Sequence, residues 1–361
     1  MKKLDLYIIK KYLSSFFFTM LLISMVAVVI DFSEKVNRFI DARLDFIDVL
    51  TTYYLNFIPW INGMMWPLFS LIAVIFFTSR MAKNSEIVAM LSSGVSLNRI
   101  MIPYLIAAGL VAGMLWFGKN HLIPHSCKIK NEFENEYLKK NSKKTLHNDI
   151  HFFLSPNEKF YTRYYRKRDT TGQTVRLESF KDARLVRVLS AERIVFKEQP
   201  NVWTLVDYTE RSFNDLDEAL VVHKGEKLDT VLDLTPEDFV RNTKLMENMT
   251  TKDLNDYIDR ARERGLGDSK GFLIEKHLRN SQPFTILILT IIGFAVSARK
   301  VRGGMGFHLA VGVILGAAFV IISKFAATFS NNMNLSPALG AWLPNIIFLA
   351  VALFIVKYSQ K

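Results

Sequence analysis

Long apolar runs lie towards both ends of the chain, and a polar segment separates them. Six runs lack Asp, Glu, Lys and Arg and come close to or exceed the roughly 20 residues that a helix needs to cross a bilayer. They are residues 12–30, 49–79, 100–118, 280–298, 306–323 and 336–356. The second run is too long for one upright crossing and contains Pro59 and Pro67, so we expect tilt, a kink or an interfacial first turn.

The polar segment has a different period. Between residues 148 and 234 apolar and polar positions alternate, as in half-buried strands, for example over residues 159–165 and 202–208. Many short strands without intervening helices predict an antiparallel sandwich, a jelly roll or an open barrel, and leave the topology open. Thr250 and Asp253 then resemble a capping box that begins a connecting helix, and Gly265 is a natural stop.

Composition supports a membrane protein with a polar middle. Of the 361 residues 50% are hydrophobic, residues 281–361 contain no Asp or Glu, and residues 119–279 hold 27 of the 34 acids. A disordered chain, a coiled coil and a single soluble globule are therefore excluded. The one cysteine, Cys127, can form no intrachain disulfide, and we expect it to fill apolar space.

The basic residues beside the spans predict the orientation. Twelve Lys and Arg flank the spans on the side of the two termini, whereas the opposite short flanks hold only four, with five acids between residues 31 and 48. The side with more Lys and Arg is cytoplasmic. Both termini are therefore expected in the cytoplasm and the central domain in the periplasm. The net charge of +12 then reflects topology and anionic lipids, and no nucleic-acid-binding signature accompanies it.

Several kinds of chemistry are missing from the sequence. It has no phosphate-binding loop and no dinucleotide fingerprint, so any ATP hydrolysis must occur in a partner. Ionisable groups within the spans are limited to His308 and the border residues Asp31 and Lys324, which argues against proton-coupled transport and favours a hydrogen-bonded structural role for His308. The histidine pairs 121/125 and 147/151 have helical spacing but no acidic third ligand at metalloprotease spacing. We expect no metal and no cofactor.

The segment between spans two and three is the most informative one. Ser85 can cap a short helix, Glu86 suits its first turn, and Gly94 ends it after roughly two turns. Its apolar residues exceed what a solvent-facing loop needs; they are Ile87, Val88, Met90 and Leu91. Such a helix fits a groove on a soluble partner, and a helix lying on the lipid headgroups is an equally good interpretation of the pattern alone.

The motifs of both membrane halves resemble those of one transporter family. The N-terminal half contains Leu4-Asp-x-Tyr7-Ile8-x-x-Lys11, Trp66-Pro67 and Ser85-Glu86-Ile-Val-Ala-Met90-x-x-Ser93-Gly94. The C-terminal half contains Leu254-x-x-Tyr257-Ile258, Gln282-Pro283, Gly312-x3-Gly316 and Leu343-Pro344. In these motifs the chain resembles the LptF/LptG permeases of the lipopolysaccharide export ABC transporter, and its opening residues favour an LptG-like subunit.

The resemblance implies a fold with defined boundaries. We expect an α-helical membrane protein with six transmembrane helices (3+3) and an inserted all-β, jellyroll-like periplasmic domain. Spans one to three would occupy residues 1–125, with a cytoplasmic coupling helix at about residues 85–94. The β domain would occupy residues 126–248, connecting helices residues 249–279, and spans four to six residues 280–361.

The resemblance also implies partners. The chain would be a transport subunit, not an enzyme, and would pair with an LptF-like permease over an LptB-like cytoplasmic ATPase dimer. Lipopolysaccharide would leave the outer leaflet of the inner membrane between spans one and five of opposite subunits. It would then pass through the β domains to a bridge towards the outer membrane, and an LptC-like membrane-anchored periplasmic protein would join this bridge.

Two groups of residues are candidates for these contacts. The ATPase-coupling residues are Ser85, Glu86, Ile87, Ala89, Met90 and Gly94. The basic residues at the outer rim that suit a phosphorylated headgroup are Lys35, Arg38 and Lys324, and interface snorkelling is the alternative for each of them. Asp31 stands where one family branch has a lysine, so headgroup contacts would differ here.

Other classes of protein remain as alternatives. The main one from a different class is a non-transporting anchor or sensor that presents the β domain to envelope partners. Another ABC permease or a tripartite-pump component would commonly carry its exported domain after the first span, and here the domain follows the third. A lipid-modifying enzyme would need a catalytic constellation that the sequence does not offer.

Overall fold

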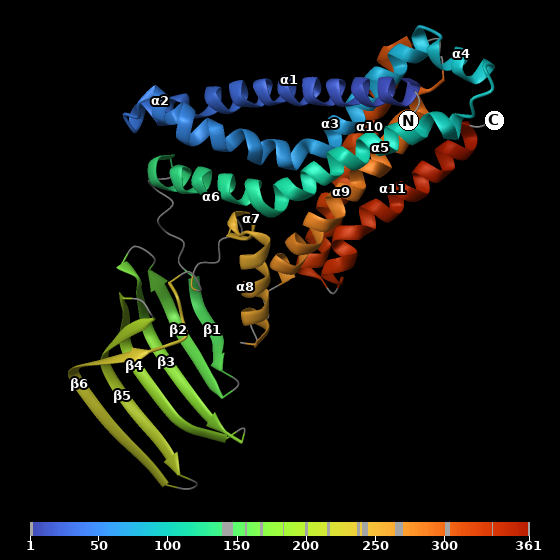
Figure 1. Ribbon diagram of the computed structural model, residues 1–361. Helices are drawn as coiled ribbons and strands as arrows, with labels where there is room; N and C mark the ends of the chain where they lie inside the picture. The colour runs from blue at the N-terminus through green and yellow to red at the C-terminus, as the bar shows by residue number, and fades with distance from the viewer. Residues whose placement is uncertain are drawn as a thin grey trace. The chain divides into compact units, whose positions relative to one another are not determined.

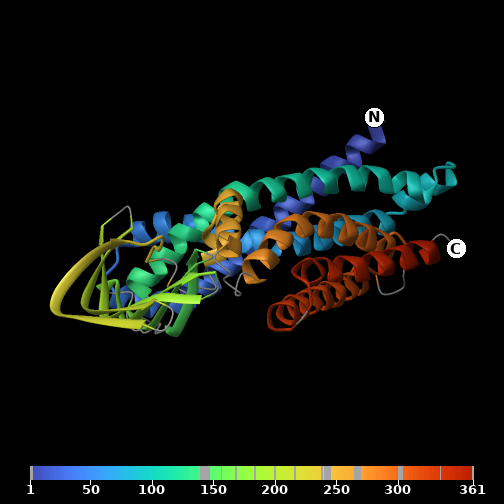
Figure 2. The same cartoon turned by 90° about the horizontal axis from the view of Figure 1, so that it is seen from below.

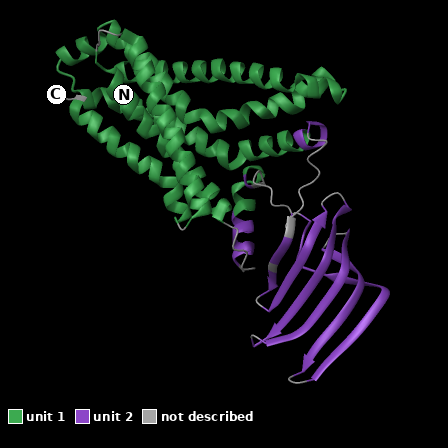
Figure 3. Ribbon diagram, turned by 180° about the vertical axis from the view of Figure 1, so that it is seen from behind, with its two compact units in different colours: residues 1–133, 247–254, 270–361 green, residues 134–246, 255–269 purple. Residues whose placement is uncertain are grey.

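Two compact units make up the part of the chain that the structure describes. The computed structural model describes residues 3–138, 147–155, 157–166, 169–182, 184–198, 201–214, 217–236, 239, 245–263, 270–299, 304–333 and 335–359. Unit 1 comprises residues 1–133, 247–254 and 270–361, and unit 2 comprises residues 134–246 and 255–269 (Figure 3).

Unit 1 is helical, and its elements follow the chain as Figure 1 shows. The first half holds α1 (Lys3–Asp41), α2 (Phe46–Asp48), the π-helical η1 (Val49–Tyr54), α3 (Leu55–Lys83), α4 (Glu86–Ser92), α5 (Leu97–Phe117), η2 (Gly118–Leu122) and α6 (Ile123–Phe133). The second half holds α9 (Lys270–Ser297), α10 (Gly304–Asn332) and α11 (Pro337–Ser359). Six helical segments of the described chain are long and apolar enough to cross a membrane, which confirms the six-span prediction.

All six helical segments are longer than the apolar runs that predict them. The second begins at Phe46 with α2 and the π-helical η1, and α3 then continues through Pro59 and Pro67. The third continues beyond Gly118 through η2, α6 and η3 (Glu134–Leu138), so one helical segment of 42 residues runs from Leu97 to Leu138. The charged residues that end an apolar run therefore do not end the helix.

The centre of unit 1 is formed by α3 and α9, and α1 joins it through a group of buried hydroxyls. Tyr12 Oη shares hydrogen bonds with Ser70 Oγ at 2.7 Å and with Thr290 Oγ1 at 3.2 Å. These side chains come from α1, α3 and α9, and none is more than slightly exposed. Each hydroxyl satisfies another one, so three polar groups are accommodated without a buried charge.

The two Gly-x3-Gly pairs have different surroundings. A Cβ on Gly312 would lie 2.2 Å from Ile75 Cδ1, and one on Gly316 would lie 3.0 Å from Leu68 Cδ2, so this pair allows α10 to approach α3 closely. A Cβ on Gly109 or Gly113 of α5 would meet no atom of the described chain within 4 Å. Of the two pairs, Gly312-x3-Gly316 therefore lies at a close helix contact of the described chain and Gly109-x3-Gly113 does not.

Unit 2 contains one antiparallel sheet, which confirms the all-β prediction. Its strands are β1 (His147–Ser155), β2 (Glu158–Arg166), β3 (Thr171–Lys181), β4 (Arg184–Glu198), β5 (Val202–Asn214) and β6 (Asp217–Val231). Each pairs with its neighbours in the sequence, so the described strands form a meander with the order β1-β2-β3-β4-β5-β6. Figure 2 shows that the sheet is strongly curved.

Aromatic side chains form much of the buried core of this sheet. Trp203 is buried and donates from Nε1 to the carbonyl of Leu234 at 3.0 Å, while its ring meets that of Phe239 edge-on. Phe239 also stacks on Tyr165, with ring centroids 4.2 Å apart. The segment that follows β6 thus supplies side chains that complete the core of the sheet.

A crease crosses the sheet. It lies where the inward–outward alternation of side chains shifts by one residue, at the same row of several strands. Consecutive buried positions are three residues apart instead of two, as at Ala191 and Ile194 in β4 and at Leu205 and Tyr208 in β5. The ladder pairs Ala191 with Tyr208 and Arg193 with Val206, so the two slips are aligned. Asp207 has a φ of 54°, in the left-handed region, and the β4–β5 register is unchanged across this row, so neither strand gains a residue over the other. The aligned slips crease the sheet while both halves of each strand keep their apolar side inward.

The connection to the fourth span follows the prediction. Thr250 and Asp253 form the expected reciprocal capping contacts, with Thr250 Oγ1 donating to Asp253 Oδ2 at 2.7 Å, and α8 runs from Thr251 to Glu263. A short α7 (Leu245–Asn248) precedes it. Gly265, the expected stop, lies outside the described residues. Residues 271–279 are continuous with the fourth span in α9.

Candidate functional site

The short helix α4 is the first candidate site, and its start differs from the prediction. Ser85 precedes the helix with a φ of 61°, in the left-handed region, and its side chain makes no capping hydrogen bond. An N-cap serine needs an extended backbone to reach the amides of the first turn, so this conformation explains the missing cap. The expected capping role of Ser85 is therefore wrong in this structure.

The end of α4 is built as predicted. Gly94 has a φ of 85°, and its amide donates to the Leu91 carbonyl at 3.0 Å. The amide of Val95 donates to the Met90 carbonyl at 3.2 Å. These two bonds are the Schellman pattern, in which a glycine adopts the left-handed conformation that side chains disfavour. Gly94 thus reverses the chain into α5.

The apolar residues of α4 divide between two faces. Ile87 is only 1% exposed and Met90 is partly buried, and both pack against the core of unit 1. Val88 is 54% exposed and Leu91 is 42% exposed, and Ala89 between them is exposed as well. The predicted coupling residues thus include Ile87, which packs on the core, and do not include Val88 and Leu91, which are exposed. Their i, i+3 spacing places them on one helix face and is a signal that the sequence contained.

Glu86 lies in the first turn of α4 and is already engaged. Tyr7 Oη donates to Glu86 Oε2 at 3.2 Å, and Asn84 Nδ2 donates to Glu86 Oε1 at 3.4 Å. The nearby Arg80 and Lys83 are exposed. Glu86 is partly exposed, so its carboxylate can be held in place and still be reached from solvent.

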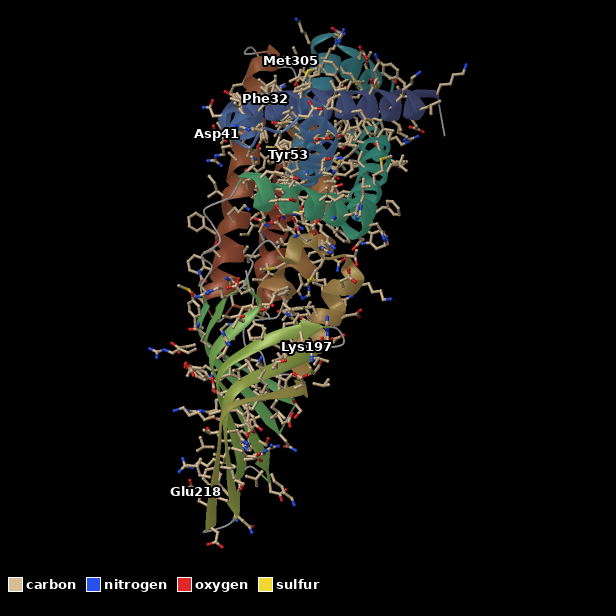
Figure 4. The ribbon with its side chains drawn as sticks, turned by 90° about the vertical axis from the view of Figure 1, so that its left-hand side faces the viewer. Phe32, Asp41, Tyr53, Lys197, Glu218 and Met305 are labelled. Atoms are coloured by element: carbon tan, nitrogen blue, oxygen red, sulfur yellow. The ribbon has the colours of Figure 1, made fainter. Side chains whose placement is uncertain are left out.

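The basic residues predicted at the rim lie in two different surroundings. Lys35 forms an ion pair with Asp31 at 2.6 Å and also contacts Tyr53 Oη, and its Nζ lies 4.9 Å from the centroid of the Tyr53 ring. Figure 4 labels Tyr53 and Phe32, two of the aromatic residues of this region. Because Asp31 neutralises Lys35 within the subunit, Lys35 is a less available anion ligand than the sequence suggested. Arg38, one turn further along α1, is exposed.

Lys324 is exposed on α10 and lines a pocket of about 120 Å³ within unit 1. The pocket also contains two other cations and two acids; these are Lys119, Arg279, Glu247 and Glu275. Arg279 is 2% exposed and donates to Glu275 Oε1 at 3.0 Å. The structure thus separates Lys324 from the aromatic surroundings of Lys35, and the pocket carries more positive than negative side chains.

The histidines show no metal-binding arrangement among the described residues. Ser79 Oγ and His308 Nδ1 lie 2.8 Å apart in a buried contact between α3 and α10, so His308 is hydrogen-bonded as predicted. No group of three or more potential ligands comes together in the described part of the chain. The side chain of His147 lies outside the described part of the chain.

The whole chain was also compared with known proteins. A family model described as "Lipopolysaccharide export system permease LptF/LptG" matches residues 6–358. The match covers nearly the whole chain, including both groups of apolar helices and the sheet between them. No curated protein matches the chain.

Proposed function

We propose, from the premise that this chain belongs to the LptF/LptG family of lipopolysaccharide export permeases, that it is a membrane subunit of an ABC transporter that extracts lipopolysaccharide from the inner membrane. The family is one of transport subunits, and six apolar helices fit a multi-pass inner-membrane protein. The observation that carries the finer proposal is α4, a capped helix with an exposed apolar face and one held carboxylate.

In this proposal α4 is the coupling helix for an LptB-like ATPase dimer. Val88, Leu91 and Ala89 offer apolar contact area, and Glu86 offers a charge for a basic group of the partner. Ile87 and Met90 contribute by fixing α4 on the core of unit 1. Ser85 and Gly94 set the two chain reversals that project the helix.

Glu86→Lys tests this contact. We expect the variant to insert normally and to lose copurification of the ATPase and lipopolysaccharide transport, because the charge at the interface is reversed. Glu34→Lys, an equal charge change at an exposed position of α1, is the matched control and should retain the ATPase. Undiminished copurification with Glu86→Lys would remove Glu86 from the contact, and it is also what a non-transporting anchor or sensor predicts.

The lipid path is proposed between α1 of one permease and α10 of an LptF-like partner. Both helices present large apolar side chains outward, for example Leu21 and Met25 on α1 and Ile314 and Phe325 on α10. In a bilayer such surfaces face lipid tails or another helix. Arg38 on α1 and Lys324 on α10 are the exposed cations proposed for the phosphorylated headgroup, each on the helix that its own subunit contributes to the path. Lys35, paired with Asp31, lies one turn from Arg38 on α1.

The β domain, residues 126–248, is proposed to lie in the periplasm and to receive the lipid. β6 is an end strand of the described sheet, and Leu220, Val221 and Val222 on it are at least half exposed. An apolar end strand can pair with a strand of another protein. This supports an LptC-like bridge partner and a jellyroll-like continuation across the envelope.

Cysteine labelling tests the orientation with both termini in the cytoplasm. Lys181→Cys on the sheet should react with a membrane-impermeant maleimide in cells with a permeabilised outer membrane, whereas Ser92→Cys in α4 should react only after the inner membrane is opened. Both positions are exposed, and the native Cys127 is buried and should give little background. The reverse labelling pattern would overturn the proposed topology.

A further inference from the structure

The first turns of α1 contact the coupling region at two points. Tyr7 Oη donates to Glu86 Oε2 at 3.2 Å, at the start of α4. Asp5 Oδ2 accepts from Arg99 Nη2 at 2.9 Å, in the first turn of α5 that follows α4. Residues near the N-terminus thus reach both sides of a helix that lies about 80 residues later in the sequence.

The other residues of the opening motif hold this turn in place. Ile8 is fully buried in the core of unit 1, and Leu4 packs against the same core. Lys11 Nζ lies 5.9 Å from the centroid of the Tyr7 ring. Asp5 and Tyr7 therefore project from an anchored helix, and their polar groups have little freedom to point elsewhere.

Arg99 is a cation at the N-terminal end of a helix, where a positive charge is unfavourable. Its amide donates to the Ser96 side chain, so Arg99 lies in the first turn of α5, where the positive end of the helix dipole disfavours a cation. Asp5, whose side chain is only 7% exposed, supplies the opposite charge. A carboxylate so well buried is costly without a partner, so the two charges stabilise each other's placement.

We propose that Tyr7 and Asp5 are positioning residues for ATPase coupling: Tyr7 holds the Glu86 carboxylate in its docking orientation, and the Asp5–Arg99 pair fixes the joint between α4 and α5. This inference rests on the proposed function, because it deepens the role of the same coupling helix. Its physical basis is preorganisation, since a charge that is already oriented loses less rotamer freedom on binding.

The first test is Tyr7→Phe, which removes one hydroxyl from a partly exposed ring and should not disturb folding. The purified permease complex in nanodiscs is titrated with the host ATPase. We expect an increase in Kd of about threefold to tenfold, as for loss of one partly exposed hydrogen bond to a charged group. Tyr358→Phe, an equal change at an exposed tyrosine of α11, is the matched control and should bind as the unmodified complex does.

A double-mutant cycle separates positioning from general stability. If Tyr7 acts through Glu86, then Tyr7→Phe should have no further effect in a Glu86→Ala background, in which the acceptor of its hydrogen bond is absent. A role of Tyr7 that is only structural would instead weaken binding by the same factor in both backgrounds. Equal factors in both backgrounds, or no effect in either, would overturn the proposal for Tyr7.

The Asp5–Arg99 pair is tested by exchange of its charges. Asp5→Arg alone should lower the transport achieved per ATP hydrolysed, and Asp5→Arg combined with Arg99→Asp should restore most of it. If the single variant does not fold, the milder Asp5→Asn replaces it. Coupling that is unchanged in the folded single variant, or a loss that the exchange does not rescue, would overturn the role of this pair.

The outcomes also distinguish the inference from the function on which it rests. If the unmodified complex binds no ATPase, the proposed function and this inference fail together. If it binds the ATPase while the Tyr7 and Asp5 variants behave like the control, only the inference fails.

Discussion

The helices α3 and α9 bury most of their membrane-spanning residues inside unit 1, whereas α1 and α10 leave most of theirs unburied. In the central membrane windows, 61% and 67% of the residues of the spans containing α3 and α9 are buried, against 17% in each of α1 and α10. Yet α1 and α10 are the more apolar pair. In a membrane protein, therefore, high hydropathy does not predict burial inside the protein.

The reason is that the hydrophobic effect, which drives apolar side chains into the core of a soluble protein, does not drive helices together within a bilayer. Lipid tails are as apolar as leucine, so helices associate through close packing and hydrogen bonds instead of through hydrophobicity. The central helices show both features: Gly293 of α9 lies against Val74 of α3, and Ser70 and Thr290 exchange hydrogen bonds between the same two helices. The apolar faces of α1 and α10 are left for lipid or a second permease.

This comparison predicts that a buried charge on a central helix carries more stability than an exposed charge on an outer one, and Arg279 on α9 is the strongest test. Its guanidinium binds Glu275, the Met249 carbonyl at 2.9 Å and the Thr251 hydroxyl at 3.1 Å. Arg279→Met leaves Glu275 without this partner, and breaking a buried pair costs about 3–5 kcal/mol. We expect about 3 kcal/mol, the lower end, because Glu275 is partly exposed. Denaturation in mixed micelles measures the loss.

Arg38→Met on α1 is the matched control, since Arg38 is exposed and should leave stability unchanged. A second change, Glu275→Met, should recover most of the loss caused by Arg279→Met, because no buried charge then remains unpaired. If Arg279→Met is no more destabilising than Arg38→Met, burial on the central helix α9 does not determine how much a charged side chain contributes to stability.

A smaller effect is expected where α10 meets α11. A Cβ on Gly340 would lie 2.3 Å from Ser330 Cβ and 3.2 Å from the Ala326 carbonyl oxygen, so Gly340→Ala forces the two helices apart. Overpacking of this kind costs about 1–3 kcal/mol. Only 17% of the membrane window of α10 is buried, so this helix has few other contacts that could compensate. The change should therefore lower the midpoint of thermal unfolding of the detergent-solubilised chain. Gly113→Ala, at an open position of α5, should be neutral or stabilising; equal effects of the two changes would contradict this view of α10.

The smallest effect is expected at Tyr12, where an exposed helix contacts the centre. Tyr12→Phe keeps the ring and removes the hydroxyl that Ser70 and Thr290 share. Hydrogen bonds between membrane helices average about 0.6 kcal/mol, and the two remaining hydroxyls still bond each other at 3.2 Å. The same denaturation assay should therefore show a loss of about that size. A loss larger than that of Gly340→Ala would reverse the ranking of packing over hydrogen bonding.

Part of the candidate site could be predicted from local pattern. The end of α4 at Gly94 followed from the glycine itself, because the left-handed turn is a local requirement. The cap at Ser85 did not follow, since the turn between α3 and α4 imposes a φ of 61° on that residue. The inward direction of Ile87 depends on which side of α4 meets the core, and only the packing of α4 on unit 1 decides this.

The contacts of the charged residues could not be predicted from local pattern either. The sequence identified Lys35 and Lys324 as basic residues near span ends, but it could not show that Asp31 pairs with Lys35 while Lys324 lines a separate pocket. Nor could it connect Tyr7 with Glu86, because 79 residues separate them. Such pairs are set by the packing of α1 on the later helices.

The six apolar spans, the inserted strands and the family could all be recognised from the sequence, because hydropathy, alternation and motifs are properties of short stretches of chain. The central position of α3 and α9, the creased meander of the sheet, and the contact between the opening motif and α4 emerged only from the folded structure. The physical reason is that each of these depends on which surfaces meet across long separations, and in lipid the hydropathy of a helix does not specify its neighbour.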